Sequence, residues 1–401
     1  MDWQTPEDTV PSAFITEANA RSVLGKPPAS GAWRDGDPAG SRKFVSIGRT
    51  RLERGGELPT VRLAFETIGT LNSSASNAIL IAHALTGDSH VTGGPGPGHA
   101  TGGWWNELVG PGKAVDTDHW FVVAPNMLGG CQGTTGPASY APDGAEWGRR
   151  FPFVTIRDQV DAQLALTNAL GIDRWAAVIG GSMGGMQSLE WATSYPERVE
   201  RVAVLAAPAQ SSADQIALNS VQLEAVRMDP AFADGEYYEA ADGDGPHRGL
   251  ALARRMALLN YRSPGELNDR FERSAQSEVS PLGDGGRYAV ESYLDFHGNK
   301  FTRRFDANSY LTLLEAMNSH DVGRGRGGIV AALAKVTMPA LILAIDSDRL
   351  FPVPDQQFIA EHAPGNLDGD HPHLINSPFG HDGFLIEDAL VGPQIRRLLS
   401  T

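Results

Sequence analysis

One serine with small neighbours on both sides is the residue best placed to do chemistry, in Gly180-Gly181-Ser182-Met183-Gly184. The apolar run from Trp175 to Ile179 has the length of a strand, and helix-forming residues from Met186 to Tyr195 follow the serine. At a sharp strand-to-helix turn the backbone is strained, so the residues flanking the serine must be small. The helix N-terminus also favours developing negative charge. The pattern predicts a nucleophilic serine, although an ordinary glycine-rich turn would also fit these five letters.

A serine hydroxyl becomes an effective nucleophile when a histidine accepts its proton and a carboxylate holds that histidine in one tautomer. In hydrolase-like α/β chains the order is serine, acid, histidine, with each residue on a loop beyond the carboxyl end of a strand. Asp346 and Asp348 both follow the apolar run from Ala340 to Ile345. We favour Asp348, which lies one step into the loop, and interpret Asp346 as a carboxylate that stabilises the turn.

The candidates for the base are four histidines near the C-terminus: His362, His371, His373 and His381. We favour His381 because glycines flank it in Gly380-His381-Asp382-Gly383 and permit close approach, and because a closing helix is expected directly after it. His371 and His373 have the character of surface loop or strand residues. The sequence therefore predicts that His381 serves Ser182 as the base, with Asp348 as the acid.

Acyl transfer also needs two amide donors for the oxyanion, each worth roughly 3–4 kcal/mol. We expect the first to be the N–H of Met183, directly after the nucleophile. The second is expected from the loop that follows the apolar run Asn77 to Ala82. In that loop we choose Leu85, with Thr86 as the alternative.

Three further side chains are of types that bind metals or act as nucleophiles. His83 and His90 lie in the same loop, but no carboxylate or cysteine pattern accompanies them, so we predict no metal site. Cys131, the single cysteine, lacks the strand-to-helix context of a nucleophile, and we interpret it as packing within a glycine-rich loop. One cysteine also excludes an internal disulfide and is compatible with a reducing cytoplasm.

Strand-like and helix-like segments alternate from Lys43 to Leu205 and again from Ala340 to the C-terminus. Such alternation predicts a mostly parallel sheet covered by helices on both faces, which defines the α/β class. Between these parts the alternation stops, and helical patterns with Gly/Asp-rich connectors suggest a lid inserted into a continuous sheet. The expected organisation is a loosely ordered arm over 1–42, the first part of the core over 43–209, the lid over 210–328 and the second part of the core over 329–401. The predicted lid helices are 215–227, 249–261 and 309–318, and a final helix is expected over 386–399.

The composition fits a soluble enzyme better than a membrane protein or a nucleic-acid-binding protein. A chain of 401 residues with 41% hydrophobic residues can bury a large core. Its formal net charge of −15 disfavours a general nucleic-acid-binding surface. No apolar run approaches the ~20 residues that cross a bilayer, and the N-terminus lacks the apolar stretch of a signal peptide. We therefore expect a soluble, cytoplasmic protein.

Five segments together resemble the homoserine O-acyltransferases of methionine biosynthesis, the acetyltransferases with an α/β-hydrolase fold. The matching stretches are His83 to Gly87, Asn126 to Pro137, Gly180 to Gln187, Asp348 to Pro352 and Gly380 to Gly383. The resemblance extends from about Lys43 to the C-terminus and leaves out the arm. The stretch from Asn126 to Pro137 is its most specific part, because generic esterases do not carry it.

The resemblance implies an α/β-hydrolase core whose helical lid forms a deep tunnel, often in a homodimer built through the lid. It implies ping-pong transfer, in which Ser182 takes an acetyl group from the co-substrate acetyl-CoA and passes it to L-homoserine, with His381 as base and no permanently bound cofactor. The family's substrate positions carry over to Arg254, for the carboxylate of the amino acid, and to Asp382, for its ammonium group. Tyr261, two helical turns after Arg254, is expected to line the same pocket.

Related activities of the same residues stay open at this point. Water in place of homoserine would make a serine esterase or thioesterase. A succinyl donor or a serine acceptor would keep the same fold, although residues 131–137 offer no cation for a succinyl carboxylate, which favours acetyl. A non-catalytic binding protein would have lost one of the three reactive groups, and all three are present.

Overall fold

An eight-stranded sheet forms the centre of residues 23–401, the part of the chain that this computed structural model describes. Residues 1–22, which belong to the predicted arm, lie outside the described residues. The strand order is β1-β2-β6-β3-β7-β8-β9-β10; β2 runs antiparallel to β1 and β6, and the other neighbours are parallel. The strands of the sheet are β1 (Lys43–Arg51), β2 (Glu57–Ile68), β3 (Ala78–Ala82), β6 (Phe121–Pro125), β7 (Ala177–Gly181), β8 (Val202–Leu205), β9 (Ala340–Ile345) and β10 (His373–Ile375). The mostly parallel sheet of the α/β prediction is confirmed.

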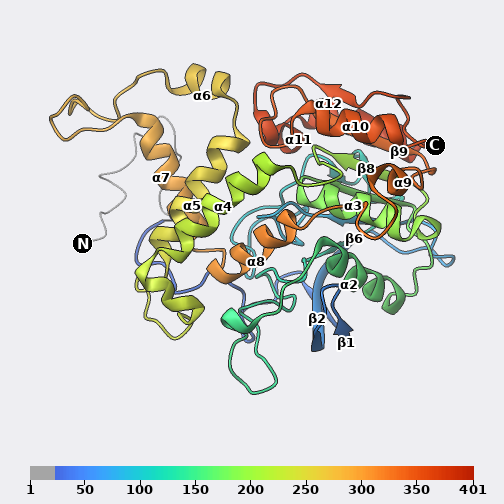
Figure 1. Cartoon of the computed structure of the whole chain (residues 1–401), viewed down its shortest axis with the longest axis horizontal. Helices are drawn as coiled ribbons and strands as arrows, with labels where there is room; N and C mark the ends of the chain where they lie inside the picture. The colour runs from blue at the N-terminus through green and yellow to red at the C-terminus, as the bar shows by residue number, and fades with distance from the viewer. Residues whose placement is uncertain (1–22) are drawn as a thin grey trace.

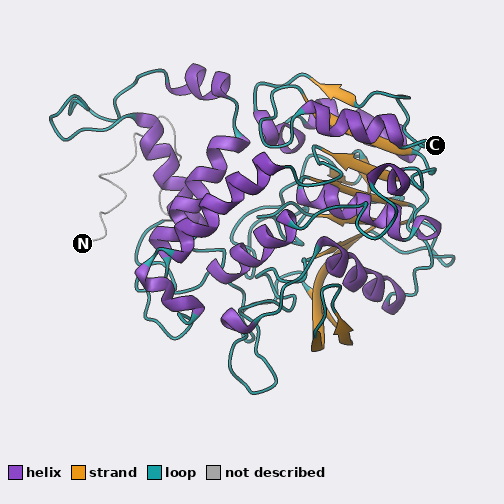
Figure 2. Cartoon of the chain, viewed as in Figure 1, coloured by secondary structure: helices purple, strands orange, loops and turns teal. Residues whose placement is uncertain are grey.

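Alternate residues of the central strands face two separate hydrophobic cores, because successive side chains of a strand point to opposite faces. Leu80 and Val178 pack into one core together with residues of α2, α3 and α10. Ile79 and Ile179 pack into the other core, which α12 covers. The helices of these two layers are α2 (Ile156–Ala169), α3 (Met183–Ser194), α9 (Ile329–Leu333), α10 (Val353–His362), α11 (Gly383–Ile386) and α12 (Asp388–Leu399). Figure 2 shows the strands between helices in the right half of the molecule.

The insertion between β8 and β9 is helical and gathers beside the sheet, at the left of Figure 1. Its helices are α4 (Ala213–Arg227), α5 (His247–Tyr261), α6 (Pro264–Phe271), α7 (Ala289–Phe301) and α8 (Ala307–Asn318). Helices α4, α5 and α8 were predicted from the sequence, whereas α6 and α7 were not. Ser212 begins α4 with a capping box, in which its hydroxyl accepts the N–H of Gln215 while the Gln215 side chain accepts the N–H of Ser212. Asp306 caps α8 by accepting the N–H of Ser309 at 2.8 Å.

The described end of the predicted arm contacts both the lid and the glycine-rich loop of the core. The N–H of Gly31 donates to the carbonyl of Phe305 at 3.2 Å, and the N–H of Trp33 donates to the carbonyl of Cys131 at 2.9 Å. A Cβ at Gly31 would meet the backbone of Arg304, so a larger residue would separate the two segments. The arm therefore ties the lid to the loop over residues 126–137.

Short elements connect the main layers. They are the strand pair β4 (Val109–Gly110) and β5 (Val115–Asp116) and the short helices η2 (Gly148–Arg150), η3 (Pro196–Arg198), η4 (Pro230–Gly235) and η5 (Gly380–Asp382). The final helix expected over 386–399 is two helices, because α11 ends at Ile386 and α12 begins at Asp388. Within residues 23–401, none of the helices combines the length and the apolar character needed to cross a membrane.

Candidate active site

Ser182 occupies the junction between β7 and α3, with a backbone conformation that L-residues rarely adopt. Its φ is 57° and its ψ is −126°, whereas β7 ends one residue before it and α3 begins one residue after it. A non-glycine residue with positive φ costs free energy and persists where the surrounding structure holds it. The helix begins at Met183, three positions before the predicted start at Met186, so the turn at Ser182 is as sharp as a strand-to-helix junction allows.

The glycines around Ser182 have no room for a side chain. A Cβ at Gly184 would overlap the carbonyl group of Ala82, and a Cβ at Gly180 would overlap the backbone of Gly184. A Cβ at Gly181 would overlap the ring of Phe384. The elbow can therefore press directly against the end of β3 and against α11 only because these positions are glycine.

The three residues predicted as nucleophile, base and acid meet in one hydrogen-bonded chain. The Oγ of Ser182 lies 2.8 Å from Nε2 of His381, and Nδ1 of His381 lies 2.7 Å from Oδ2 of Asp348. Their relative exposures are 5%, 2% and 6%, respectively, so bulk water is nearly excluded. Because a carboxylate can only accept, Nδ1–H of His381 donates to Asp348, and Nε2 presents a lone pair to the serine hydroxyl.

Backbone amides in the loop after β9 orient Asp348, and Asp348 in turn orients His381. Oδ1 of Asp348 accepts the amides of Leu350 at 2.8 Å and Phe351 at 3.0 Å, which leaves Oδ2 for the histidine. Asp346, the alternative acid, instead accepts the amide of Ser377 at 2.9 Å. Burial opposes protonation of His381, but the charge of Asp348 and its hydrogen bond outweigh burial, so the pKa of the imidazole lies above its ordinary value.

The other three histidine candidates lie elsewhere. Nδ1 of His362 faces the carbonyl of Phe358 within α10, and His371 contacts Gln357 on the surface. His373 lies on β10, 3.7 Å from Asp368. None of the three contacts Ser182 through a hydrogen bond among the described residues, whereas His381 does.

The predicted oxyanion donors lie on two segments that touch at the elbow. Met183 is the first residue of α3, so its N–H is one of those that no carbonyl of the helix can accept. Leu85 is buried in the loop after β3, and Gly184 of the elbow packs on the last residue of that strand. This proximity is compatible with two amides converging beside Ser182.

Arg254 and Tyr261 lie on α5, between His381 and a neighbouring cavity. The Tyr261 ring is centred 5.8 Å from the ring of His381, and the Arg254 guanidinium lies 5.4 Å from the centre of the Tyr261 ring. Arg254 also donates to Oγ1 of Thr86, the residue after Leu85, at 3.4 Å. The predicted pocket residues thus stand between the histidine and the loop that carries the predicted oxyanion donor.

Asp382, predicted to bind the ammonium group, is paired with an arginine that the sequence analysis did not identify. Its Oδ2 lies 3.3 Å from Nε of Arg262. Burial raises the pKa of Asp382, while the charges of Arg262, His381 and Arg254 oppose that rise. Arg262 directly follows the end of α5, a position that no sequence motif marks as functional.

Three cations gather in a cavity of about 190 Å³ beside Thr86. Arg254, Lys300 and Arg304 line it, and within residues 23–401 none of them lies within 4 Å of a carboxylate oxygen. His297 shares the cavity; burial and the surrounding cations lower its pKa to about 3, so the ring is neutral. All three are half-buried, and Asp88 is the one carboxylate named in the same lining, so positive charge is in excess there and the cavity is suited to an anionic ligand. Neither Lys300 on α7 nor Arg304 just after it was predicted from the sequence, because no helix was expected in this part of the insertion.

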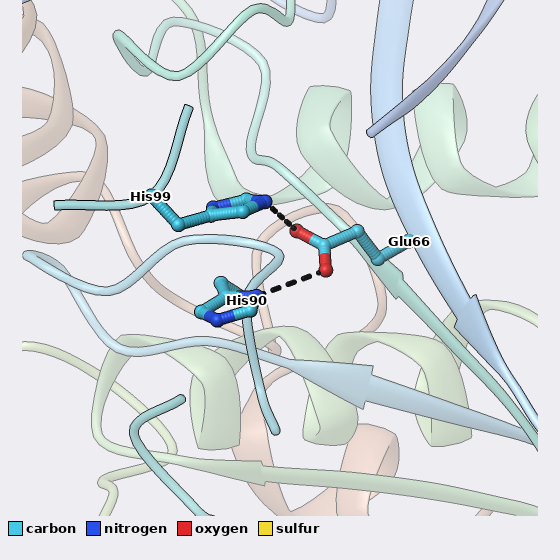
Figure 3. A group of neighbouring side chains, drawn as sticks. All are labelled: Glu66, His90 and His99. Carbon is cyan, nitrogen blue, oxygen red and sulfur yellow. Dashed lines mark hydrogen bonds and ion pairs between the residues drawn. The ribbon is translucent and has the colours of Figure 1, made fainter. Parts of the chain in front are cut away.

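The structure places the remaining three candidates, His83, His90 and Cys131, in different environments. Nε2 of His83 accepts the N–H of Met127 at 3.2 Å, so this histidine supports the backbone of the glycine-rich loop. His90 instead lies beside Glu66 and His99 (Figure 3). Glu66 supplies a carboxylate that the sequence around His90 does not reveal. Cys131 is buried, and burial raises the pKa of its thiol to about 12. Its thiolate is therefore scarce at neutral pH.

Comparison with known proteins identifies the fold and the relatives of this chain. A family model of the alpha/beta hydrolase fold matches residues 77–387. A homoserine O-acetyltransferase of Leifsonia xyli subsp. xyli is 67% identical over 401 residues, which is 100% of both chains. The solved structure of a homoserine O-acetyltransferase from Bacillus anthracis covers 90% of this chain and 97% of its own, with a TM-score of 0.80 and 28% identity. The solved structure of esterase E22 covers 89% of this chain and 99% of its own, with a TM-score of 0.80 and 29% identity.

Proposed function

The chain belongs to the homoserine O-acetyltransferase family and has the α/β-hydrolase fold, and we propose that it uses acetyl-CoA as donor and carries the acetyl group on Ser182. The observation that supports this proposal is the hydrogen-bonded chain from Ser182 through His381 to Asp348. A serine in this chain can be acylated and then deacylated, which is the chemistry of a ping-pong transferase.

In the first half-reaction Oγ of Ser182 attacks the thioester carbonyl of acetyl-CoA while Nε2 of His381 takes the hydroxyl proton. The carbonyl oxygen becomes an oxyanion, for which the amides of Met183 and Leu85 are the proposed donors. The carbon–sulfur bond then breaks, and the imidazolium of His381 returns the proton to the departing sulfur. The products of this step are acetyl-Ser182 and free CoA.

In the second half-reaction the γ-hydroxyl of L-homoserine takes the place that CoA left. His381 accepts the hydroxyl proton, and the homoserine oxygen attacks the acetyl carbonyl of acetyl-Ser182. The bond from the carbonyl carbon to Oγ of Ser182 breaks, and His381 protonates the serine again. O-acetyl-L-homoserine leaves, and Asp348 balances the charge of the imidazolium in both steps.

The charged residues around the site supply the recognition that this reaction requires. Arg254 is the proposed partner of the homoserine carboxylate, and Asp382 is the proposed partner of its ammonium group. CoA carries phosphate groups, and Lys300 and Arg304 are additional cations without a carboxylate partner among the described residues. The concentration of positive charge is local, since the whole chain has a formal net charge of −15.

A serine esterase is the second candidate, and the similarity to esterase E22 favours it. The two functions differ in whether water or homoserine attacks the acyl-serine. Purified protein with acetyl-CoA should release CoA steadily only when homoserine is present. Release that ignores homoserine would contradict transfer in favour of hydrolysis, and succinyl-CoA or serine in the same assay tests the alternative donor and acceptor.

The acyl-serine itself is tested by intact-mass spectrometry after mixing with acetyl-CoA alone. The wild-type protein should gain one acetyl group, and Ser182→Ala should gain none while losing at least about 10⁴-fold in kcat/KM. Ser220→Ala, at an exposed serine of α4, is the matched control and should behave as wild type. An acetyl adduct or full turnover in Ser182→Ala would contradict the proposed nucleophile.

Exposed apolar residues on the lid support a homodimer formed through it. Leu252 and Leu259 are seven positions apart on one face of α5, and both are exposed, at 45% and 43%. We expect the wild-type protein to sediment as a dimer and Leu252→Glu to sediment as a monomer. A monomeric wild-type protein would contradict this assembly.

A further inference from the structure

The junction between α5 and α6, residues Tyr261 to Ser263, packs against the loop that carries His381. The hydroxyl of Ser263 donates to the carbonyl of Pro378 in that loop. Gly380 has a φ of 65°, and a Cβ at this position would lie 2.7 Å from the carbonyl oxygen of Tyr261. A larger residue at Gly380 would push the two segments apart. The insertion between β8 and β9 therefore contacts the segment that holds the proposed base.

Three side chains of alternating charge form a row through this junction. Oδ2 of Asp382 lies 3.3 Å from Nε of Arg262, and Nη1 of Arg262 lies 3.8 Å from Oε1 of Glu266. The side-chain exposures of Asp382, Arg262 and Glu266 are 20%, 16% and 9%, respectively. Arg270 also approaches Glu266, at 3.5 Å, but Arg270 is itself exposed. Because the row is mostly buried, water screens its charges much less than it screens ion pairs on the surface.

The row ends at Asp382 on a negative charge that can accept one more cation. Its Oδ2 faces Arg262, and within residues 23–401 no other basic side chain has a nitrogen within 4 Å of this carboxylate. A carboxylate offers about four acceptor positions, so one arginine does not saturate it. A cation placed beside Asp382 would continue the alternation of charge, and the ammonium group is the cation that the proposed acceptor carries.

We propose that Arg262 is a positioning residue of the second half-reaction, which keeps Asp382 ionised and directed at the ammonium group of homoserine. This inference rests on the proposed role of Asp382 and adds the residue on which that role depends. Arg262 does not contact the substrate in this scheme, because its charge acts through the carboxylate. Glu266 offsets part of the repulsion that the guanidinium exerts on the ammonium group.

The ionisation of Asp382 depends on the charged and titratable groups that face it from each neighbouring element. These are Arg254 and Tyr261 of α5, Arg262 after it, His381 of η5 and Asp348 after β9. Burial raises the pKa of Asp382, and the charge of Arg262 is the strongest of those that oppose this rise. Without Arg262 the pKa of this carboxyl would rise further. The carboxyl would then be partly protonated near neutral pH and ionised again at higher pH.

Steady-state kinetics of the full chain separates the two half-reactions. In a ping-pong scheme kcat/KM for acetyl-CoA reports the acylation of Ser182, whereas kcat/KM for homoserine reports the step that needs Asp382. Arg262→Gln should lower kcat/KM for homoserine about 10–100-fold near neutral pH and leave kcat/KM for acetyl-CoA close to that of wild type. Because both steps use His381 as base, the ratio of the homoserine value to the acetyl-CoA value cancels its titration, and in this variant the ratio should recover in part between about pH 7 and about pH 8.5. Equal losses for both substrates, or a ratio that does not recover, would overturn the proposal.

Two further arginine variants test whether the charge next to Asp382 is the cause. Arg262→Lys keeps a positive charge and should retain most of kcat/KM for homoserine. Arg270→Gln is the matched control, because it removes an arginine that approaches Glu266 but not Asp382, and it should behave as wild type. The same loss in Arg262→Lys as in Arg262→Gln, or a comparable loss in Arg270→Gln, would overturn the assignment.

Asp382→Asn separates a failure of this inference from a failure of the proposed function. It should lower kcat/KM for homoserine by itself, and Arg262→Gln should add less than about 3-fold in that background, because both changes remove the same interaction. Unchanged kinetics in Asp382→Asn would contradict the ammonium role of Asp382 itself. A loss in Asp382→Asn with wild-type kinetics in Arg262→Gln would overturn only the role of Arg262. If Arg262→Gln does not fold, the wild-type ratio decides: it should stay level between about pH 7 and about pH 8.5, and a rise with pH would overturn the proposal.

Discussion

Arg254 and Arg255 are adjacent on α5, but their side chains serve different parts of the structure. Arg254 enters the cavity beside Thr86 and lies 5.1 Å from the centre of the Phe301 ring. Arg255 forms an ion pair with Asp295 of α7 at 2.9 Å. Successive residues of a helix point about 100° apart, so only one of two neighbouring arginines can face the site.

This difference predicts a specific effect on the amino-acid substrate. Arg254→Ala should raise KM for homoserine about 10–100-fold, because a charge-assisted hydrogen bond to a carboxylate contributes about 1.5–3 kcal/mol. KM for acetyl-CoA should change much less. Steady-state kinetics with each substrate varied in turn measures both values, and Arg255→Ala is the matched control. A selective loss of donor binding would assign Arg254 to CoA instead.

The raised pKa of His381 predicts the pH dependence of the reaction. In the proposed reaction the neutral imidazole is the base, so kcat/KM for acetyl-CoA should fall as the pH drops through an apparent pKa above the ordinary 6.5 of histidine. For stability the sign is opposite, because the fold favours the protonated ring. That contribution to the free energy of unfolding is fully present below pH 6.5 and is lost as the pH rises through the folded pKa. A pH–rate profile with its midpoint at or below 6.5 would contradict this prediction.

Asp348→Asn should separate the electrostatic role of the acid from its packing. The amide can no longer supply negative charge to His381, so the apparent pKa of the base should shift downward and kcat should fall about 10⁴-fold. Asp346→Asn removes the alternative carboxylate without changing the triad. It should lower stability more than it lowers kcat, as measured by thermal unfolding beside initial rates. Equal losses of kcat in both variants would leave the choice of Asp348 unsupported.

Lys300→Ala should weaken binding of the acyl donor more than binding of the acyl acceptor. Lys300 lines the cationic cavity, and in the proposed reaction the phosphate groups of CoA are anions for which Arg254 is not the proposed partner. We expect KM for acetyl-CoA to rise about 5–30-fold, with increasing salt reducing the difference between variant and wild type. Lys335→Ala, at an exposed lysine after α9, is the control. A larger effect on homoserine than on acetyl-CoA would contradict this assignment.

Cys131 should be unreactive toward thiol reagents in the folded protein. With a thiol pKa of about 12, its thiolate fraction near pH 8 is about 10³-fold below that of an ordinary cysteine. A thiol reagent should therefore label Cys131 only after denaturation, as followed by mass spectrometry. Cys131→Ala should keep most of the acyl-transfer activity. Rapid labelling of the native protein together with loss of activity would point to a catalytic thiol.

Local spacing was sufficient to predict the elbow and the order of the triad. A strand, a small-residue turn and a helix are adjacent in sequence around Ser182, so their geometry is largely local. The exact start of α3 was predicted three residues late, because Gly184 and Gly185 have low helix propensity and gain their place from packing against Ala82 and Ala207. Propensity alone cannot account for such tertiary contacts.

Other features depend on contacts that sequence spacing does not reveal. Helix α7 contains Gly298, which weakens its helical signal but lets it pack closely on Ala251 of α5. Glu66 and His90 are 24 positions apart, on β2 and in the loop after β3, and they meet only in the folded chain, where β2 pairs with β6. Asp348 and Asp346 are two positions apart, and only the hydrogen bonds of each carboxylate distinguish their roles.

The insertion between β8 and β9 also sets the order in which the enzyme can become active. Ser182 is synthesised before the lid, whereas Asp348 and His381 are synthesised after it. Until β9 emerges and pairs with β8, the nascent sheet ends in an open, wholly apolar edge strand, which is prone to self-association. Under the proposed mechanism a fragment that ends within the lid lacks both Asp348 and His381, so we expect acyl transfer only after the last segment of the chain has docked on the sheet.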